Sequence, residues 1–400
     1  MKKKKFGKST VLFIICWLLI SLWHGGFFNE NELTEHAAGR SKAAESEEAS
    51  FEIHILDVGQ GLSVLVEADG YSMLYDGGGR EYSSYVVAYL KEKGIETLSY
   101  LVASHYDEDH ISGLIGVLNT TTVETALTPD YEADSDIYQS FRSMLEGSGA
   151  AEVHPAAGDI YQLGSAEIQI LNPTAYTYED ENDNSIAIRI EYGDFSCILT
   201  GDAEEAAEAD MIASGYILDS DLYVAGHHGS SSSSSEAFVS AVSPDYVVIS
   251  AGAGNSYGHP TERTLSTIKQ SGAELYRTDV QGEIICYTDG MSTDESDSGA
   301  DTGEADAGGS DTDTGKVNCW FNVAACDNWQ SGTELSQELG VSSDTLTGSS
   351  EYVLNTRSMK FHYPDCQSVS LMSEANKETV TADRETLIEE GYSPCGNCNP

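Results

Sequence analysis

The sequence predicts an α/β domain built from layers of sheet and helix, followed by a small C-terminal unit. Three observations lead to this prediction. Short apolar runs alternate with segments of helical spacing in two series, which is typical of sheets covered by helices. Histidines and carboxylates gather in the loops that follow several of these runs. Near the C-terminus, a His/Cys pair precedes a Cys-x-x-Cys motif, a spacing that suits metal binding.

The first 28 residues have the composition of an export signal. Five lysines lie within the first eight residues, ahead of the apolar run Val11–Trp23. This pattern is typical of a secretory signal, and extension through Phe28 would make it a marginal signal-anchor, because a span needs about 20 apolar residues. We therefore expect an extracellular or cell-surface protein, held in the membrane where the segment is uncleaved. Residues 29–50 are expected to be a polar spacer.

The chain is strongly acidic, with a formal net charge of −46 from 66 acidic and 20 basic residues. Such a charge favours solubility and repels nucleic acids and anionic membranes at long range. The composition therefore argues against a simple nucleic-acid-binding protein. A length of 400 residues allows two or three domains.

The main domain is expected over residues 51–290. Its first strand starts at Phe51, where apolar and polar residues alternate as in a half-buried strand. The glycine-containing turn Leu56–Gly61 follows, and two further strands lead to Asp76-Gly77-Gly78-Gly79. Residues 82–93 have helical spacing, which predicts a helix after the third strand.

The most informative stretch is Ser104-His105-Tyr106-Asp107-Glu108-Asp109-His110. It follows the short buried strand Tyr100–Val102 and Ala103, and it precedes a segment with the pattern of a helix start. Two histidines and two aspartates therefore lie in one loop at the C-terminal end of a strand, where their side chains can turn toward one point. Imidazole and carboxylate groups are ligands of Zn²⁺ and Mn²⁺. The loop predicts a metal centre.

Three later strands also end in residues of ligand type. In chain order these residues are Asp202, the pair His227 and His228, and His259, which is followed by a helix beginning near Pro260. Of the ten histidines, five therefore lie in only three strand-end loops. We predict that these loops together form a binuclear metal centre.

These motifs resemble the metallo-β-lactamase superfamily. Its His-x-His-x-Asp-His signature is matched from His105 to His110, with Asp107 in the place of the second histidine. This exchange, the turn at 56–61, the Asp-Gly-Gly loop and an Asn-x-x-Ser segment at 182–185 are similar to the C-terminal domain of ComEC-type competence DNA-uptake proteins. The resemblance extends from Phe51 to about Asp289 and implies a metallo-β-lactamase-type four-layer αββα sandwich.

The resemblance also implies how the ligands divide between two divalent metal ions, Zn²⁺ or Mn²⁺. One ion would be held by His105, Asp107 and Asp202, and the other by Asp109, His110, Asp202 and one of His227 and His228. Asp202 would bridge the two ions, and a water between them would be the nucleophile. The implied catalytic residues are Asp109, His228 and His259, with His259 or the second of the paired histidines acting on the leaving group. Many members supply one more histidine, which residues 155–202 lack, so one ion would have fewer protein ligands.

The activity implied by this branch is that of a metal-dependent hydrolase, namely a phosphodiesterase or nuclease acting on DNA or another phosphodiester. Two alternatives stay open: a hydrolase of another small ester, amide or phosphoester, and a non-catalytic cell-surface binding protein with a structural metal site. Asp107 argues against a β-lactamase, since those enzymes rely on histidine there. DNA uptake by this chain alone is not expected, because no channel-forming part is seen. No obligate protein partner is inferred.

The chain beyond residue 290 divides into three parts. Residues 291–316 are expected to be an acidic disordered linker, since Ser292–Gly315 holds eight acidic and no basic residues. Residues 317–350 give no clear prediction as a whole, although residues 333–339 could form a short helix and Cys319 and Cys326 could pair as a disulfide outside the cell.

Residues 351–400 form a second organised unit. The pairs His362-x3-Cys366 and Cys395-x2-Cys398 supply four ligands, as a structural zinc site requires. The segment resembles the Ada-like zinc module at the ends of some secreted nucleases, which implies a small α+β module with one structural zinc ion. In an oxidising compartment, two disulfides are the alternative.

Overall fold

The computed structural model describes residues 51–292, 317–338 and 350–395, the last range with gaps at 365, 367, 370–371, 374–375, 383–386 and 388–391. The predicted signal, the spacer and residues 293–316 of the acidic linker lie outside these ranges. Within the described ranges, none of the helices is both long enough and apolar enough to span a bilayer.

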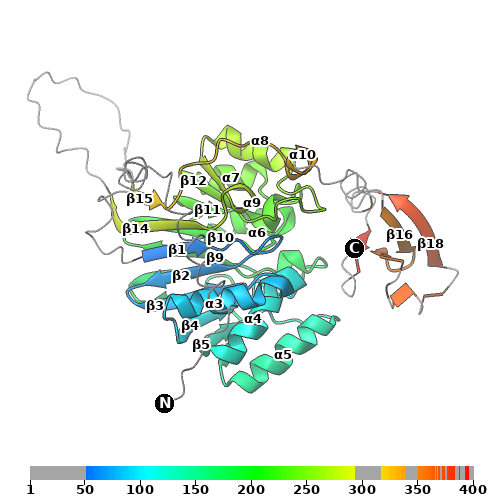
Figure 1. Cartoon of the computed structure of the whole chain (residues 1–400), viewed down its shortest axis with the longest axis horizontal. Helices are drawn as coiled ribbons and strands as arrows, with labels where there is room; N and C mark the ends of the chain where they lie inside the picture. Colours follow the sequence, from blue (N-terminus) through cyan, green and yellow to red (C-terminus); the bar gives the residue numbers. More distant parts are fainter. Residues whose placement is uncertain are drawn as a thin grey trace, which may run out of the picture. The chain divides into compact units, whose positions relative to one another are not determined.

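Two sheets pack face to face, and helices cover the outer face of each (Figure 1). The predicted αββα sandwich is confirmed. The first sheet has the order β15-β14-β1-β2-β3-β4-β5-β6, and the second has the order β13-β12-β11-β10-β9-β8-β7. Each sheet is therefore built from one half of the domain, and only β14 and β15 return to the first sheet, beside β1.

The strands of the first sheet are β1 (Phe51–Ile55), β2 (Val64–Ala68), β3 (Tyr71–Tyr75), β4 (Thr97–Val102), β5 (Thr122–Leu127), β6 (Ala151–Val153), β14 (Ile284–Ser292) and β15 (Val317–Phe321). Those of the second sheet are β7 (Ile160–Leu163), β8 (Ala166–Asn172), β9 (Ala187–Tyr192), β10 (Phe195–Leu199), β11 (Leu222–Val224), β12 (Tyr246–Ile249) and β13 (Glu274–Arg277).

The helices are α3 (Ser83–Glu92), α4 (Glu108–Thr120), α5 (Asp136–Ser148), α6 (Glu205–Ser214), α7 (Glu236–Val242), α8 (Glu262–Ser271), α9 (Thr278–Gln281) and α10 (Gly332–Glu338). Short 3-10 turns are η1 (Arg80–Tyr82), η2 (Asn182–Asn184) and η3 (Gly226–Gly229). Helices α3, α4 and α5 pack on the first sheet, and α6, α7 and α8 pack on the second.

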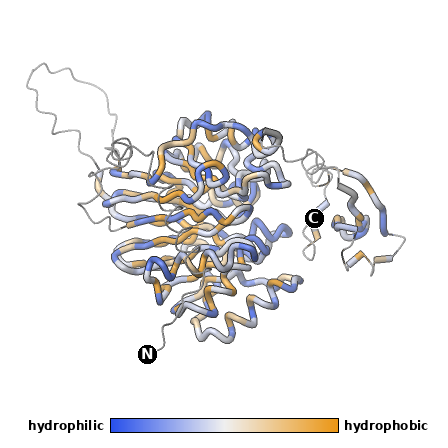
Figure 2. Tube along the Cα trace, in the orientation of Figure 1, coloured by the Kyte–Doolittle hydropathy of each residue, from blue (hydrophilic) through white to orange (hydrophobic). Residues whose placement is uncertain are grey.

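A continuous apolar core fills the space between the two sheets. Ile53 and Val66 of the first sheet meet Ile188 and Leu199 of the second in this core, and all four are fully buried. Figure 2 shows hydrophobic residues along the central strands. Because a fully buried Val, Leu or Ile stabilises the fold by about 1.5–3 kcal/mol, this interface gives the loops at the strand ends a rigid support.

The strand directions bring the predicted ligand loops to one edge of the sandwich. Strand β3 pairs in parallel with β4, and β10, β11 and β12 pair in parallel with one another. The carboxyl ends of parallel strands lie at the same edge of a sheet. The loops that follow these five strands are those that hold the predicted ligands and the Asp-Gly-Gly sequence.

Residues 317–338, where the sequence predicts only a short helix over 333–339, complete the main domain, and α10 corresponds to that helix. Strand β15 pairs antiparallel with β14, and Phe321 stacks on Tyr276 with 4.0 Å between ring centroids. The expected pairing of Cys319 with Cys326 is not formed. Cys319 Sγ lies 2.8 Å from Cys286 Sγ on β14, while Cys326 packs in the helix-covered core of the second sheet.

The C-terminal unit has a sheet of its own, with the order β18-β16-β17-β19. Its strands are β16 (Ser350–Asn355), β17 (Lys360–His362), β18 (Lys377–Ala382) and β19 (Ser393–Pro394). Only Tyr352, Leu354, Phe361 and Leu387 form its buried apolar cluster among the described residues. A core of this size supplies little stability, so a further stabilising element is expected.

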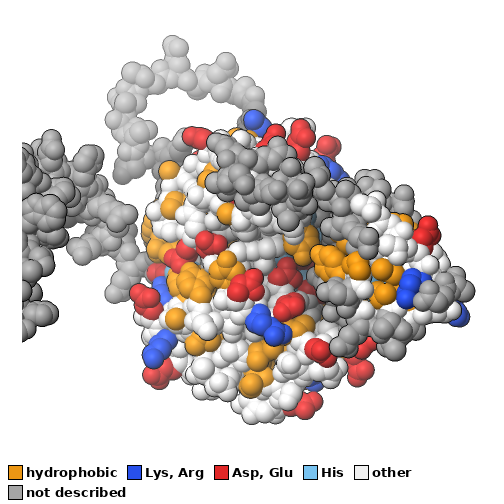
Figure 3. Space-filling view, turned by 45° about the vertical axis from the view of Figure 1, so that its right-hand side comes forward, with side chains coloured by type: hydrophobic (Ala, Val, Ile, Leu, Met, Phe, Trp, Pro, Cys, Tyr) orange, Lys and Arg blue, Asp and Glu red, His pale blue; other side chains and the backbone are white. Residues whose placement is uncertain are grey.

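Acidic side chains are spread over the face drawn in Figure 3, with few Lys and Arg side chains among them. This distribution agrees with the net charge of −46.

Candidate metal centre

The carboxylate of Asp202 lies among four histidine rings. Its Oδ1 is 3.3 Å from His110 Nε2. Its Oδ2 is 3.5 Å from His228 Nε2, 3.7 Å from His227 Nε2 and 4.0 Å from His105 Nε2. Since both carboxylate oxygens face imidazole nitrogens, this buried side chain is placed to bridge two cations.

The predicted ligands form two groups that meet at His110. His105, His110 and Asp202 place ligand atoms within 4.8 Å of one another, and so do Asp109, His110 and His228. Asp107 is partly exposed at the edge of the first group, where its Oδ2 lies 3.8 Å from His105 Nε2. The structure therefore brings the seven predicted metal ligands to one place.

The surroundings of His105 suit a metal ion. Its Nε2 is buried and has no hydrogen-bond partner, whereas its Nδ1 lies 3.0 Å from Ser104 Oγ and 3.4 Å from Ser185 Oγ. Burial, with the neighbouring His110, lowers the pKa of His105 to about 4, so the ring is neutral at pH 7. An unpaired buried polar atom costs about 1–3 kcal/mol. A cation beside Nε2 would remove that cost.

Asp76 orients His110 and was not among the residues predicted from the sequence. It is fully buried, and its Oδ2 accepts hydrogen bonds from His110 Nδ1 (2.7 Å) and Ser104 Oγ (2.6 Å). This leaves His110 Nε2 facing Asp202. A carboxylate on the far nitrogen of a histidine ligand fixes the ring orientation. The sequence feature that could have indicated Asp76 is its place at a strand end, directly before three glycines.

Glycine allows this loop to reach the helix that carries His110. A Cβ atom on Gly113 would lie 1.7 Å from Gly77 O. At this close approach, Gly77 N donates to His110 O (2.7 Å) and Gly113 N donates to Gly78 O (3.0 Å). The Asp-Gly-Gly loop is therefore joined by its backbone to the start of α4.

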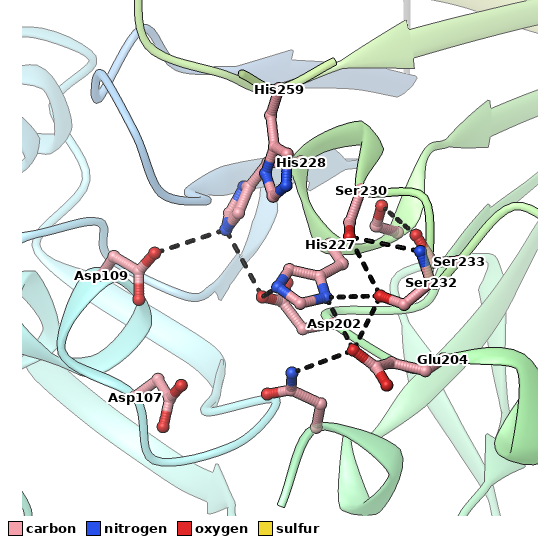
Figure 4. A network of polar contacts seen from close by, with 12 residues as sticks. Asp107, Asp109, Asp202, Glu204, His227, His228, Ser230, Ser232, Ser233 and His259 are labelled. Carbon is pink, nitrogen blue, oxygen red and sulfur yellow. Dashed lines mark hydrogen bonds and ion pairs between the residues drawn. The ribbon is translucent and has the colours of Figure 1, made fainter. Parts of the chain in front are cut away.

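His227 and His228 leave a strained turn in different directions (Figure 4). Their φ angles are 47° and 55°, in the left-handed region that costs about 1–3 kcal/mol for such residues and is common at functional sites. His228 Nδ1 donates to Ser250 O (3.1 Å), and His227 Nδ1 donates to Glu204 Oε1 (3.1 Å). Each Nε2 is thus turned toward Asp202. Glu204, like Asp76, was not predicted.

His259 lies beside the ligand groups and is not part of them. It is 3% exposed, and its ring centroid lies 5.6 Å from that of His227. Its Nδ1 is 3.4 Å from Gln60 Nε2 on the turn after β1. Figure 4 shows its side chain extending toward the centre next to His228.

Residues 56–253 match the family model described as the metallo-beta-lactamase superfamily. The main domain belongs to the metallo-β-lactamase superfamily. Competence protein ComA of Neisseria gonorrhoeae is 31% identical over 249 residues, which cover 61% of this chain and 33% of that protein. ComE operon protein 3 of Bacillus subtilis is 30% identical over 255 residues, which cover 58% of this chain and 32% of that protein. The resemblance to the ComEC-type branch is confirmed.

The chain spans about a third of the length of these curated relatives. Among solved structures, the metallo-β-lactamase fold protein YhfI from Bacillus subtilis is 15% identical, with a TM-score of 0.40, and the match covers 57% of this chain and 96% of that one.

Without metal, the metallo-β-lactamase centre is a network of opposite charges. Burial disfavours a charged His228, but Asp202 and Asp109 outweigh it and raise the pKa of His228 to about 9. In the same way, Asp202 and Asp76 raise the pKa of His110 above its ordinary value. Burial disfavours an ionised Asp202 as well, yet His110 and His228 lower its pKa.

The C-terminal unit contains a second candidate site. His362, Cys366 and Cys395 place ligand atoms within 4.8 Å of one another. Both ring nitrogens of His362 are buried and lack a hydrogen-bond partner, which suits a metal ligand. Cys366 and Cys395 are not joined as a disulfide. The fourth predicted ligand, Cys398, lies outside the described residues.

We expect metal binding at the main centre to release protons. At pH 7 the raised pKa of His228 keeps its ring protonated in the metal-free protein, whereas a metal ligand must be neutral. Apparent affinity for Mn²⁺ should therefore rise between about pH 7 and pH 9. Calorimetric titration in two buffers of different ionisation enthalpy would count the protons, and His228→Ala should release about one fewer. Binding with no proton release at pH 7 would contradict this protonation state.

We expect Asp202→Ala to lose most of the metal of the main domain, because it removes the group placed between both ligand sets. Elemental analysis of the whole chain should give about three metal equivalents in the wild type and about one in the variant, the latter from the C-terminal unit. The control is Asp245→Ala, an exposed carboxylate ahead of β12. Equal metal content in all three proteins would exclude a bridging role for Asp202.

We expect the C-terminal unit to unfold when zinc is removed, because its small core depends on metal binding for folding. Chelation should make residues 350–400 sensitive to protease while the main domain stays resistant, and His362→Ala should show the same pattern without a chelator. Peptide mapping that finds Cys366, Cys395 and Cys398 in disulfides would show that the zinc assignment is wrong.

Proposed function

We propose that the main domain is a metal-dependent phosphodiesterase and that nucleic acid, DNA first, is its substrate. The observation that carries this proposal is the buried group of imidazoles around Asp202, with one unpaired nitrogen on His105. That donor set suits two divalent cations. One curated relative is a competence protein by name, ComA of Neisseria gonorrhoeae, which supports DNA as the substrate class.

Two bound cations would act as Lewis acids and lower the pKa of a water enough for attack on phosphorus at neutral pH. Around them, the side chains have separate tasks. Asp109 is 28% exposed, and its Oδ2 lies 3.4 Å from His228 Nε2. Burial opposes its ionised form, but His228 and His110 hold the pKa of Asp109 below its ordinary value. Asp109 therefore stays a carboxylate that can ligate and can orient an attacking water.

His259 is suited to act on the leaving oxygen. It lies in the loop after β12, whereas the predicted ligands lie in the segments after β4, β10 and β11, and its side chain extends toward the centre (Figure 4). An imidazole in contact with the leaving oxygen could act on it as a general acid.

The acidic surface of the protein repels a polyanionic substrate at long range, so attraction has to come from the metal centre at short range. Two divalent cations would make the centre locally positive, while the remaining surface repels a polyanion at a distance. We propose that the protein works outside the cytoplasm, secreted or held at the cell surface. The lysine-rich start followed by an apolar run supports this location.

We expect Asp109→Asn to lower kcat by at least about 100-fold, since asparagine keeps the size but loses the charge and the ability to accept a proton. Hydrolysis of DNA, RNA and bis(p-nitrophenyl) phosphate would be measured with Mn²⁺ and with Zn²⁺. The control is Glu108→Gln, the neighbouring carboxylate, which is 56% exposed and lies 3.5 Å from Arg80. Wild-type rates in Asp109→Asn would remove its catalytic role. A metal-loaded wild type that cleaves no phosphodiester would favour a binding protein or another esterase.

We expect the KM for DNA to fall as salt is raised from low to moderate concentration, because ions screen the repulsion between the acidic surface and the polyanion. A basic nucleic-acid binder shows the opposite slope. Steady-state assays across a salt series would measure this dependence, with the small substrate bis(p-nitrophenyl) phosphate as the control that should change little. A KM for DNA that rises steadily with salt would indicate a basic binding surface elsewhere.

A further inference from the structure

Residues 317–338, which we call the strap, connect the first sheet to the loop that carries His259. The strap starts as β15, paired with β14, and ends in α10, whose first residue, Gly332, donates a hydrogen bond to Pro260 O (Figure 1). It lies outside residues 56–253, the part that matches the superfamily model. A segment that follows the acidic linker thus reaches the neighbourhood of the candidate metal centre.

The end of the strap packs backbone to backbone on the His259 loop. Gly332 N donates a hydrogen bond to Pro260 O (2.9 Å). A Cβ atom on Gly332 would lie 2.1 Å from His259 O, and one on Gly258 would lie 2.5 Å from Thr333 Oγ1. The two backbones touch at Gly332, and the Thr333 side chain fills the space that a Cβ atom on Gly258 would take. A shift of the strap must therefore move the loop.

Asn255 holds the same loop from the inside. Its Nδ2 donates to His259 O (2.6 Å), and its Oδ1 accepts from His259 N (3.0 Å). Asn255 thus fixes the peptide groups on both sides of His259. The strap contacts the same loop at the carbonyl groups of His259 and Pro260. The imidazole lies beside Gln60, His227 and Tyr257.

A fully buried arginine fixes the strap just before Gly332. Arg277 is 0% exposed, and its guanidinium pairs with Asp279 at 3.0 and 2.7 Å. Its remaining group donates to Asn328 O (3.1 Å) and Gln330 O (2.5 Å). A buried cation is tolerated only when it is paired and hydrogen-bonded. The strap carbonyls are part of that pairing, so this part of the strap has one defined position.

We propose that the strap is a positioning element for His259 and that the catalytic unit therefore includes residues beyond the acidic linker. This inference rests on the proposed role of His259 in the phosphodiesterase reaction. The strap supplies none of the predicted ligands of the main centre. It acts by fixing the backbone from which His259 reaches the centre.

The test is Gly332→Ala in the full chain, compared with Gly147→Ala. An added Cβ at Gly332 would meet the His259 carbonyl, whereas at Gly147, in α5, it would meet nothing within 4 Å. We expect kcat to fall by about tenfold or more in Gly332→Ala because a displaced catalytic group loses its geometry. The pH–rate profile should approach that of His259→Ala, and the metal content should match the wild type. Gly147→Ala should change none of these.

Hydrogen exchange separates the strap proposal from the proposed function. Amides of residues 252–261 should exchange faster in Gly332→Ala, and in Arg277→Lys if the first variant does not fold, with no change in the central strands. This result would support the strap even if the wild type hydrolysed no phosphodiester. Unchanged exchange in this loop would show that the strap does not position it. Faster exchange together with loss of metal would show that the strap acts on the metal centre and not on His259 alone.

A second inference concerns the two cysteines at the start of the strap. Cys286 Sγ and Cys319 Sγ are 2.8 Å apart on paired strands. We infer that an oxidising environment joins them as a disulfide, since only a small side-chain movement separates them from the S–S bond length of about 2.05 Å. Each thiol gives up one proton and one electron, and a small-molecule disulfide such as oxidised glutathione accepts them and becomes two thiols. The bond would tie the strap to β14 across the acidic linker.

Peptide mapping without reductant tests this bond. After the full chain is incubated with oxidised glutathione, the peptides that contain Cys286 and Cys319 should be linked. The link should be lost in Cys319→Ser and kept in Cys326→Ser. Free Cys286 and Cys319 after oxidation, or a peptide that joins Cys319 to Cys326, would overturn the assignment.

Discussion

The contact between the Asp202 carboxylate and the surrounding imidazoles is the interaction on which the candidate centre depends. Four histidines reach this side chain from two loops on opposite sheets, with nitrogen–oxygen distances from 3.3 to 4.0 Å. Without a cation, the buried carboxylates are balanced by protonated histidines, as the raised pKa of His228 indicates. Metal ions would replace protons as the positive charge. The same side chains therefore serve folding and metal binding.

Several features of the fold serve mainly to point these nitrogens inward. Three histidines donate a hydrogen bond from Nδ1: His110 to Asp76, His227 to Glu204 and His228 to the Ser250 carbonyl. Each acceptor comes from a different strand end. Since each acceptor holds one nitrogen, the other is available at the centre. The close approach of Gly77 and Gly113 and the left-handed backbone at His227 and His228 follow from this requirement.

Much of this arrangement could be predicted from sequence because its signals are local. Apolar runs ending in His105–His110, Asp202 and His227–His228 predicted both the strands and the ligands. Asp76 and Glu204 were missed because each orients a histidine that is distant in the sequence and that only the fold brings near; Asp76 and His110 are 34 positions apart. Likewise, the helix beginning near Pro260 was found, but its first residue is Glu262, with Thr261 as the cap that accepts from Thr264 N.

The strap shows more clearly what local sequence patterns cannot predict. Before α10 its sequence has no clear periodicity, and several of its contacts are made by main-chain groups, such as the carbonyls that Arg277 binds and the amide of Gly332. Main-chain groups leave no mark on the residue type, apart from glycine where two backbones touch. An acidic linker in front of such a segment resembles a domain boundary, yet β15 shows that the fold continues beyond it. A linker-like composition therefore does not by itself mark the end of a domain, because the residues that follow it can belong to the same sheet.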